Sequence, residues 1–332
     1  MNEMKHVKEM NTRTSVDNQV SFNSNKATRL TTINCSFARK THQLNRSEMN
    51  NLTVGRLLGA GGFGSVYEGV LKGRRVAVKR LHVNTKNPHA VAESFLAEVA
   101  VVSLRHKNIV RILAVSSAGA AAQQIHIIME YAGNRNLQNV IDNDKERITD
   151  QRRERYAIDI TSALYYIHER RVVHLDLKPA NILVSCQDSC KIGDFGCSKI
   201  LPQNGMCSPA TPTNSFLTGT LSYRAPELLR GDFPSNKADI YSLGICLWQL
   251  LTREKPYGSE NLYVVIFGVV AYNLRPSFTK KIKQKYKLYA QLCEALWKAN
   301  PIERPQASTV LHALRTKIRK RTETKPVLLW RA

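Results

Sequence analysis

The stretch VVHLDLKPANILVS, residues 172–185, carries the densest group of chemistry-bearing side chains in this chain. Asp176, Lys178 and Asn181 stand close together, directly before the apolar run ILVS, which is typical of a short buried strand. A carboxylate can orient a hydroxyl and accept its proton, an ammonium can neutralise a phosphoryl group, and an amide oxygen can hold a metal ion. We therefore take Asp176 and Lys178 as candidate catalytic residues and Asn181 as a candidate metal ligand.

A glycine-rich segment, GAGGFG at 59–64, lies upstream between two predicted strands. Glycine lets backbone amides approach a polyphosphate closely, so Gly59, Gly61, Gly62 and Gly64 are candidate nucleotide contacts. The same spacing occurs in dinucleotide-binding folds, where it opens a helix. Here the chain continues into the strand-like SVYEG, which favours a hairpin that covers phosphates. A plain glycine hairpin without a ligand is the alternative.

The segment VAVK places Lys79 in the strand that follows. An ammonium that faces inward from a strand needs an anion as partner. Glu98, on the next predicted helix, is the candidate partner, and Glu93 is the alternative. Such a pair would hold Lys79 ready for phosphate oxygens.

Two further signals follow the first stretch in the chain. GDFG places Asp194 at the end of a short predicted strand, where its hard oxygen atoms suit Mg²⁺. APE, residues 225–227, is followed much later by Arg304 in ERP. We expect Glu227 and Arg304 to form a structural ion pair that takes no part in the chemistry.

The hydrophobic pattern divides the chain into regions. Residues 1–50 are rich in Asn, Thr, Ser and Lys without periodicity, which predicts a flexible basic tail. From Leu52 to Tyr131, strand-like runs surround one predicted helix at 89–104. After Tyr131 the pattern is mainly helical: residues 152–170 are amphipathic, and residues 238–252 are apolar on nearly every side, as in a buried helix.

Bulk composition indicates a soluble protein of a reducing compartment. The chain of 332 residues has 49 Lys and Arg against 26 Asp and Glu, a net charge of +23. No apolar run reaches the ~18 residues of a membrane span. Seven scattered cysteines favour free thiols, although Cys186 and Cys190 form half of a possible zinc site. The charge suits phosphates, nucleic acid or acidic proteins, but no aromatic platform for nucleic acid accompanies it.

The five signals together, in this order, make the chain resemble a eukaryotic protein kinase from about Leu52 to about Ile318. The resemblance implies an α+β fold of two lobes, a small antiparallel β lobe at about 52–131 and a larger helical lobe at about 132–318. A basic tail at 319–332 would follow. ATP and Mg²⁺ would bind in the cleft between the lobes, and Asp194 and Asn181 would hold the metal.

The same resemblance implies how the nucleotide is contacted. Glu98 would orient Lys79. The hinge would run from Glu130 to Ala132, with Met129 as gatekeeper. Three apolar side chains would enclose the adenine: Val66, Ala77 and Leu183. Lys178 and Thr220 resemble the serine/threonine kinases rather than the tyrosine kinases.

Within the kinases, the stretches VVHLDLKPANILVS, KIGDFGCSK and KADIYSLGICLWQLLTREKPY resemble the Mos family. Leu175 and Cys197 fit that family. The resemblance implies a cytoplasmic, monomeric kinase that phosphorylates a MAP kinase kinase and acts in oocyte meiosis. It implies no specific nucleic acid partner and no membrane span. The N-terminal tail does not resemble the usual start of the family.

Other functions remain open on the sequence alone. A Raf-like or mixed-lineage kinase would also phosphorylate a MAP kinase kinase and shares the glycine segment. A pseudokinase scaffold would be expected to lack at least one of Lys79, Asp176, Asn181 and Asp194, and all four are present. A nucleic-acid-binding protein is suggested by the net charge alone.

Three residue-level hypotheses follow from the same stretches. Leu175 stands where most kinases have an Arg that grips a phosphate on the activation loop, so we expect activity without phosphorylation of residues 194–227. Cys197 would face the nucleotide cleft, where it is either a reactive thiol or a small buried side chain. Ser208 and Thr211 precede prolines and are candidate phosphorylation sites.

Overall fold

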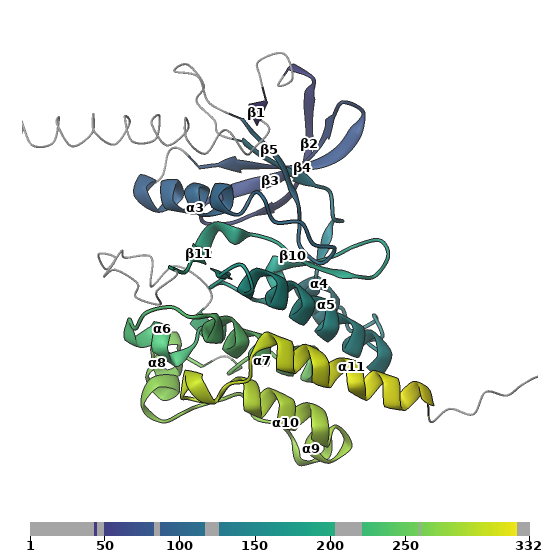
Figure 1. The fold of residues 1–332 in the computed structure, drawn as a ribbon, viewed down its shortest axis with the longest axis vertical. Helices are drawn as coiled ribbons and strands as arrows, with labels where there is room; N and C mark the ends of the chain where they lie inside the picture. Colours follow the sequence, from purple (N-terminus) through teal and green to yellow (C-terminus); the bar gives the residue numbers. More distant parts are fainter. Residues whose placement is uncertain are drawn as a thin grey trace, which may run out of the picture.

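The computed structural model describes residues 43–44, 50–82, 87–116, 126–202, 221–258 and 260–323, with the side chains of 43–44 and 317–323 left aside. These residues form two lobes stacked one above the other, the predicted α+β kinase architecture (Figure 1). The expected tails, Thr220 and both Ser/Thr-Pro sites lie wholly or largely outside the described residues.

The small lobe is built on a six-stranded sheet with the order β1-β5-β6-β4-β3-β2. Neighbouring strands are antiparallel except for β1, which pairs in parallel with β5. The strands are β1 (Gln43–Leu44), β2 (Leu52–Ala60), β3 (Gly64–Leu71), β4 (Arg74–Leu81), β5 (Ile112–Ser116) and β6 (His126–Glu130). The predicted strands are therefore present, and β1 adds two residues from the segment that we expected to be tail.

Strand β4 has a central place because its two faces feed two different clusters. Ala77 and Leu81 pack with the cluster under helix α3, whereas Val76 and Val78 pack on the opposite face with Ile128. This alternation follows from the strand period of two. Lys79 is on the same face as Ala77 and is only 6% exposed, so the fold itself buries this ammonium.

Helix α3 (Pro88–Ala100) lies beside the sheet and begins at a well-formed cap, since the Asn87 side chain accepts a hydrogen bond from Ala90 N. The predicted end at residue 104 was wrong, because the helix ends at Ala100. Val101 and Leu104 instead belong to the core of the large lobe, whereas Val102 stays with the small lobe. The chain must leave the helix to reach both cores.

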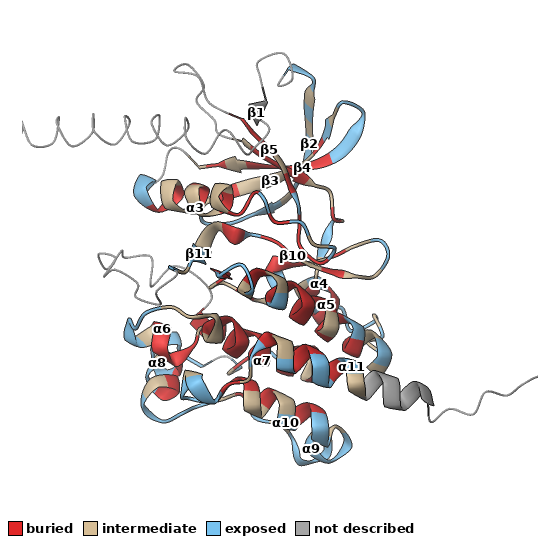
Figure 2. Cartoon of the chain, in the orientation of Figure 1, coloured by how far each residue is buried: buried red, intermediate tan, exposed pale blue. Residues whose placement is uncertain are grey.

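The large lobe is organised around helix α7 (Asn236–Thr252), whose residues from Ala238 to Leu251 are all buried, as Figure 2 shows. Helix α5 (Asp150–His168) presents the predicted stripe to the same core, and the four residues of that stripe are at most 1% exposed: Tyr156, Ile160, Leu164 and Ile167. Both helix predictions are confirmed.

Short strands and turns connect the two lobes and carry the candidate site. They are β7 (Arg135–Asn136), α4 (Leu137–Asp142), β8 (Val172–Val173), η2 (Pro179–Asn181), β9 (Ile182–Val184), β10 (Cys190–Ile192), η3 (Phe195–Cys197), β11 (Lys199–Ile200) and η5 (Leu221–Tyr223). The rest of the large lobe consists of α6 (Pro226–Arg230), α8 (Leu262–Ala271), α9 (Lys280–Lys285), α10 (Lys287–Leu296), η6 (Pro301–Glu303) and α11 (Ala307–Glu323). In the described ranges, every helix is too short or too polar to cross a membrane.

Candidate active site

The loop that follows strand β8 is anchored from below by helix α7. The Asp239 carboxylate is fully buried and accepts the backbone N–H groups of His174, at 2.9 Å, and Leu175, at 2.8 Å. His168 Nε2 lies 2.9 Å from the same carboxylate. Burial would raise the pKa of Asp239, but His168 and His174 outweigh burial and hold the pKa below its usual value. The buried carboxylate of Asp239 therefore holds the loop to helices α5 and α7.

Leu175 adopts a left-handed backbone conformation with φ of 64°. Such a conformation costs about 1–3 kcal/mol in a residue other than glycine and persists where the surroundings impose it. The bond from Leu175 N to Asp239 is one such restraint, and the Leu175 side chain packs against the large-lobe core. The loop is thus held in a strained shape that presents the next residue, Asp176.

The three candidate residues of this loop form one hydrogen-bonded group. Lys178 Nζ lies 2.7 Å from Asp176 Oδ2, and Asn181 Nδ2 donates to the same oxygen at 2.9 Å. Asn181 Nδ2 also donates to the Asp176 carbonyl at 2.8 Å, and the short helix η2 fixes its backbone. Because its nitrogen is engaged, the amide oxygen of Asn181 is the atom available to a metal ion.

The second carboxylate, Asp194, follows strand β10 and opens the turn η3. Strand β10 is tied to the small lobe, since Val110 N donates to Ile192 O at 2.8 Å. His174 Nε2 donates to Gly193 O at 3.0 Å, so the two candidate loops are directly connected. Phe195 is buried and meets the His174 ring edge to face, with the ring centroids 4.9 Å apart.

Lys79 joins the two lobes through two carboxylates. Its ammonium pairs with Glu98 of α3 and lies 2.8 Å from Asp194 Oδ1. Burial alone would lower the pKa of Lys79, but the charges of Asp194 and Glu98 outweigh burial and raise it above its ordinary value. For Asp194 the signs are reversed: the protein atoms that crowd this partly exposed carboxylate raise its pKa, and Lys79 more than offsets this, so the carboxylate stays ionised.

The alternative partner of Lys79 lies elsewhere. Glu93 has a side chain that is 40% exposed and faces His89, one helical turn away, at 3.5 Å. Glu98, in contrast, is 1% exposed. The structure therefore selects Glu98, the partner preferred from the sequence.

The glycine segment forms the predicted hairpin between β2 and β3. Gly61 N donates to Gly64 O at 2.9 Å, and the chain continues directly into β3. Gly59 and Gly62 have open space where a side chain would stand, whereas a Cβ on Gly64 would meet Arg80 O at 2.5 Å. The first glycines leave room for a ligand, and Gly64 is required by the close approach of β4.

The residues expected around adenine gather in the small-lobe cluster. Ala77, Met129 and Ala132 are buried members of that cluster, and Val66 and Leu183 are partly buried and pack against it. Leu183 comes from strand β9 of the large lobe, so the two lobes share this apolar wall. Glu130 ends strand β6 next to it and pairs with Lys191 at 2.9 Å.

The oxygen atoms of Asp194 and Asn181 are of the type that would suit Mg²⁺. Asp194 has a side chain that is 44% exposed, and its Oδ1 faces Lys79. Its second oxygen and the Asn181 amide oxygen are hard ligands of the type that Mg²⁺ prefers. The elements therefore bring together two hard oxygen ligands, a buried ammonium and an apolar wall, which are the groups that a site for ATP and Mg²⁺ would need.

The structure does not favour a reactive thiol at Cys197 or a zinc site at Cys186 and Cys190. Burial, followed by the charges of Asp176 and Asp194, raises the pKa of the Cys197 thiol to about 12, so a reactive thiolate at this position is not favoured. Cys190 is buried and Cys186 is exposed. The described residues contain no cluster of ligands around them that would complete a zinc site.

The predicted ion pair between Glu227 and Arg304 is present and buried. Arg304 Nη1 lies 2.6 Å from Glu227 Oε1, and Nη2 lies 2.8 Å from Oε2. Arg304 also donates to the carbonyl groups of Lys237 and Lys298. It thus joins α6 to the C-terminal helices, away from the candidate site.

Sequence reasoning missed two positioning residues, Asp239 and His174. Asp239 is an acid in the first turn of an otherwise apolar helix, and that contrast was a usable signal. His174 stands two residues before Asp176 and links the two loops through Gly193 O, a contact that its residue type alone does not indicate.

The sequence profile described as "Protein kinase domain" matches residues 52–314. A serine/threonine-protein kinase mos of Patiria pectinifera is 45% identical over 266 residues, which cover 80% of this chain and 75% of that protein. The proto-oncogene serine/threonine-protein kinase mos of Mus musculus is 41% identical over 274 residues, with 78% of each chain covered. A serine/threonine-protein kinase mos of Gallus gallus is 41% identical over 278 residues, again with 78% of each chain covered.

Proposed function

Because this chain belongs to the protein kinases, and among them to the Mos serine/threonine kinases, we propose that it phosphorylates a MAP kinase kinase and acts in oocyte meiosis. As a serine/threonine protein kinase it uses ATP. Mg²⁺ as the metal, the cytoplasm as the place of action and a monomeric state belong to the proposal.

The contact of Lys79 with both Glu98 and Asp194 is the observation that supports an active enzyme. A buried ammonium between two carboxylates is ready to exchange one of them for phosphate oxygens. Since α3 carries Glu98, the small lobe already stands in the position that phosphate binding needs. A pseudokinase scaffold would have no use for this arrangement.

We assign the chemistry to the loop around Asp176. Both Lys178 and Asn181 bond to Asp176 Oδ2, so Oδ1 is the oxygen that would orient the substrate hydroxyl and take its proton. Lys178, at 2.7 Å from the carboxylate, would neutralise charge on the transferred phosphoryl group. Mg²⁺, held by Asn181 and Asp194, would supply charge neutralisation between the nucleotide phosphates.

The test uses the full chain, purified and incubated with labelled ATP·Mg²⁺ and a MAP kinase kinase made inactive by substitution of its own catalytic lysine. We expect label in that substrate, and no label when Asp176→Asn replaces the active chain. Asp144→Asn is the matched control, because Asp144 is an exposed acid in the turn between α4 and α5. If the chain phosphorylated a general Ser/Thr substrate but left the MAP kinase kinase unlabelled, the proposed substrate would be wrong. The assignment as a serine/threonine kinase would still hold.

The Raf-like and mixed-lineage alternatives predict the same reaction, so substrate alone does not separate them. The named relatives favour the Mos family. The same panel of protein substrates can be offered to this chain and to a Raf kinase. If the two enzymes share the MAP kinase kinase but differ in their other substrates, the result favours a family separate from Raf.

A further inference from the structure

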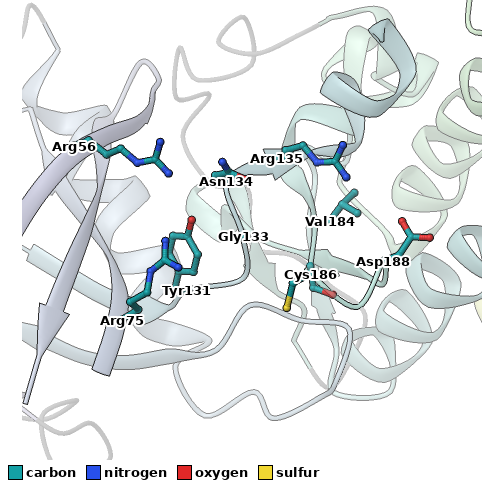
Figure 3. Close-up of a pocket in the computed structure, with 10 residues that line it drawn as sticks. Arg56, Arg75, Tyr131, Gly133, Asn134, Arg135, Val184, Cys186 and Asp188 are labelled. Atoms are coloured by element: carbon teal, nitrogen blue, oxygen red, sulfur yellow. The ribbon is translucent and has the colours of Figure 1, made fainter. Parts of the chain in front are cut away.

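A pocket of about 340 Å³ lies next to the segment that connects the lobes, and of the residues expected around ATP only the hinge position Tyr131 lines it. Ala132 packs into the apolar wall expected around adenine, whereas its neighbour Tyr131 lines the pocket. Figure 3 shows Tyr131 beside Arg75 on one wall of this space. A ligand in the pocket would therefore occupy a site separate from the nucleotide.

Both lobes and the segment between them contribute to the lining. Arg56 of β2 and Arg75 of β4 form the small-lobe wall. Asn134 and Arg135 continue the connecting segment, and the turn between β9 and β10 supplies the opposite wall (Figure 3). Any ligand that touches both walls must hold the two lobes in a fixed relation.

The small-lobe wall carries more positive than negative charge. Arg56 Nε lies 2.9 Å from Glu68 Oε2, and Arg75 Nε lies 2.8 Å from Glu68 Oε1, so two guanidinium groups share one carboxylate. The side-chain hydrogen bonds from Arg56 and Arg75 lower the pKa of Glu68, which therefore stays ionised at neutral pH. Arg56 and Arg75 remain 62% and 57% exposed.

The opposite wall repeats this pattern. Arg135 pairs with Glu146 at 2.8 Å, and Arg152 pairs with both Glu146 and Asp188. Arg155 adds a further contact with Asp188. Of the residues that line the pocket, three are arginines (Arg56, Arg75 and Arg135) and one is a carboxylate (Asp188), an excess of two positive charges that favours an incoming anion.

The arrangement of the guanidinium groups selects among anions. A guanidinium fork matches a carboxylate or phosphate in a bidentate manner. Arg75 is also steadied by the Tyr131 ring, with its Cζ atom 4.1 Å from the ring centroid. Figure 3 shows Arg56 and Arg75 on one wall and Arg135 on the other, so the groups do not converge on one point. Separated anions along an extended chain fit this better than one compact phosphate.

We propose that this pocket binds an extended, acidic peptide segment of a partner protein, with one carboxylate on Arg56 and Arg75 and another on Arg135. The pocket volume suffices for one or two side chains. Because the walls come from both lobes, the bound segment restrains their relative movement. The proposal goes beyond the kinase reaction and does not depend on the identity of its substrate.

The exposed thiol of Cys186, which lines the pocket, provides a direct reporter. The full chain is treated with iodoacetamide, and labelling of Cys186 is followed by peptide mass spectrometry. The probe is a capped peptide of alternating Glu and Thr, about nine residues long, so that its carboxylates lie on one side of an extended chain. We expect saturable protection of Cys186 at about 0.15 M salt that weakens at higher salt. A peptide with Gln in place of Glu should give no protection.

Substitution identifies the groups responsible. The double variant Arg56→Gln, Arg75→Gln should weaken protection about tenfold or more, since it removes charge-assisted contacts. Arg135→Gln should weaken it through the other wall. Arg74→Gln is the matched control, because Arg74 is an exposed arginine of the same strand that does not line the pocket. Its protection should equal that of the unchanged chain.

Each other outcome overturns the proposal. These outcomes are absence of protection, undiminished protection in the double variant, equal protection by inorganic phosphate at the same concentration, and protection by a phosphorylated peptide alone. The last two would show a phosphate site instead of a site for an acidic segment.

Discussion

At the scale of single residues, Lys79 is the point where strand β4, helix α3 and the loop that carries Asp194 meet. It is 6% exposed and would be costly to bury without its two partners. Glu98 and Asp194 come from different lobes, so the pairing reports whether the lobes are correctly placed. Loss of either acid leaves the buried charge of Lys79 partly unpaired.

We predict that Asp194→Asn lowers phosphoryl transfer about a thousandfold or more, because both metal binding and the position of Lys79 depend on this carboxylate. The measurement is initial rate under saturating ATP·Mg²⁺, with Asp144→Asn as control. Near-normal transfer by Asp194→Asn would show that another group holds the metal. A melting curve for each variant separates lost chemistry from lost folding.

We also predict that Cys197 is labelled slowly by iodoacetamide. With its pKa raised to about 12, the thiolate fraction at pH 8 is about one in ten thousand. Since deprotonation increases with pH, the labelling rate should rise about tenfold for each pH unit below that pKa. Mass spectrometry at several pH values, with the exposed Cys186 as internal reference, measures the rate. Fast labelling at neutral pH would mean that the thiol is ionised.

The order of short motifs made most of the site predictable, because each motif carries its own chemistry. The choice between Glu98 and Glu93 required the direction of each side chain on α3, which spacing leaves open. Asp239 was missed for a related reason: its partners are backbone N–H groups of a loop more than 60 residues away. Such contacts have no signature in the residue types of the loop itself.

At the scale of elements, helix α3 and the turn η3 are packed with almost no tolerance. A Cβ on Gly196 would lie 2.2 Å from Ser94 Oγ, whereas its next contact, Glu98 Oε1, is at 3.4 Å. The Ser94 hydroxyl is buried and has no hydrogen-bond partner within the described part of the chain. Glycine at 196 is therefore what allows α3 to bring Glu98 to Lys79.

We predict that Gly196→Ala displaces α3, weakens the pair between Lys79 and Glu98, and lowers activity by about tenfold or more. Ser94→Ala alone should have little effect, because it removes an unpaired hydroxyl. The double variant Gly196→Ala, Ser94→Ala should recover most of the loss, since the hydroxyl that clashes is gone. Initial rates of the four proteins form a double-mutant cycle. Equal losses in the single and double variants would contradict the packing argument.

The elements themselves were predictable where one period dominated over a long stretch, as in α5, α7 and the strands β2 to β4. The end of α3 was not, because Val101 and Leu104 continue a helical pattern while packing in a different core from Phe95. Strand β1 is two residues long and exists only through its pairing with β5. Its partner lies about 70 residues away, so local pattern carries no signal for it.

At the scale of the whole molecule, we expect Leu175 to affect how the kinase is switched on. An Arg at this position gains charge-assisted hydrogen bonds, worth ~1.5–3 kcal/mol each, when the activation loop is phosphorylated. Leu175 has no donor to offer and packs against the large-lobe core. Phosphorylation therefore gains nothing at this position, and we expect control through synthesis and destruction of the protein.

We predict that protein made in bacteria, and shown by mass spectrometry to be unphosphorylated between Asp194 and Glu227, phosphorylates a MAP kinase kinase at a substantial rate. Leu175→Arg should lower that rate, because its guanidinium would be left without a phosphate partner. If the unchanged protein stayed silent until a loop residue was phosphorylated, another cation would have taken over the task of the missing Arg.

The buried position of Phe195 has a consequence for inhibitors. A compound that occupies the place of this ring beside His174 must first expel it, whereas a compound that leaves the ring where it is need not. Expelling a buried phenyl ring costs about 1.5–3 kcal/mol. Compounds of the first kind should therefore have a Kd roughly ten- to a hundredfold higher than their own contacts with the site would give.

Calorimetric titration of one compound of each kind, on the unchanged chain and on Gly196→Ala, tests this prediction. The added methyl group crowds the turn that holds Phe195, so the ring should be easier to expel and the difference in Kd between the two compounds should become smaller. An unchanged difference would mean that Phe195 leaves its site without cost. With the ring in place, the chain should bind most tightly those compounds that, like ATP, leave Phe195 where it lies.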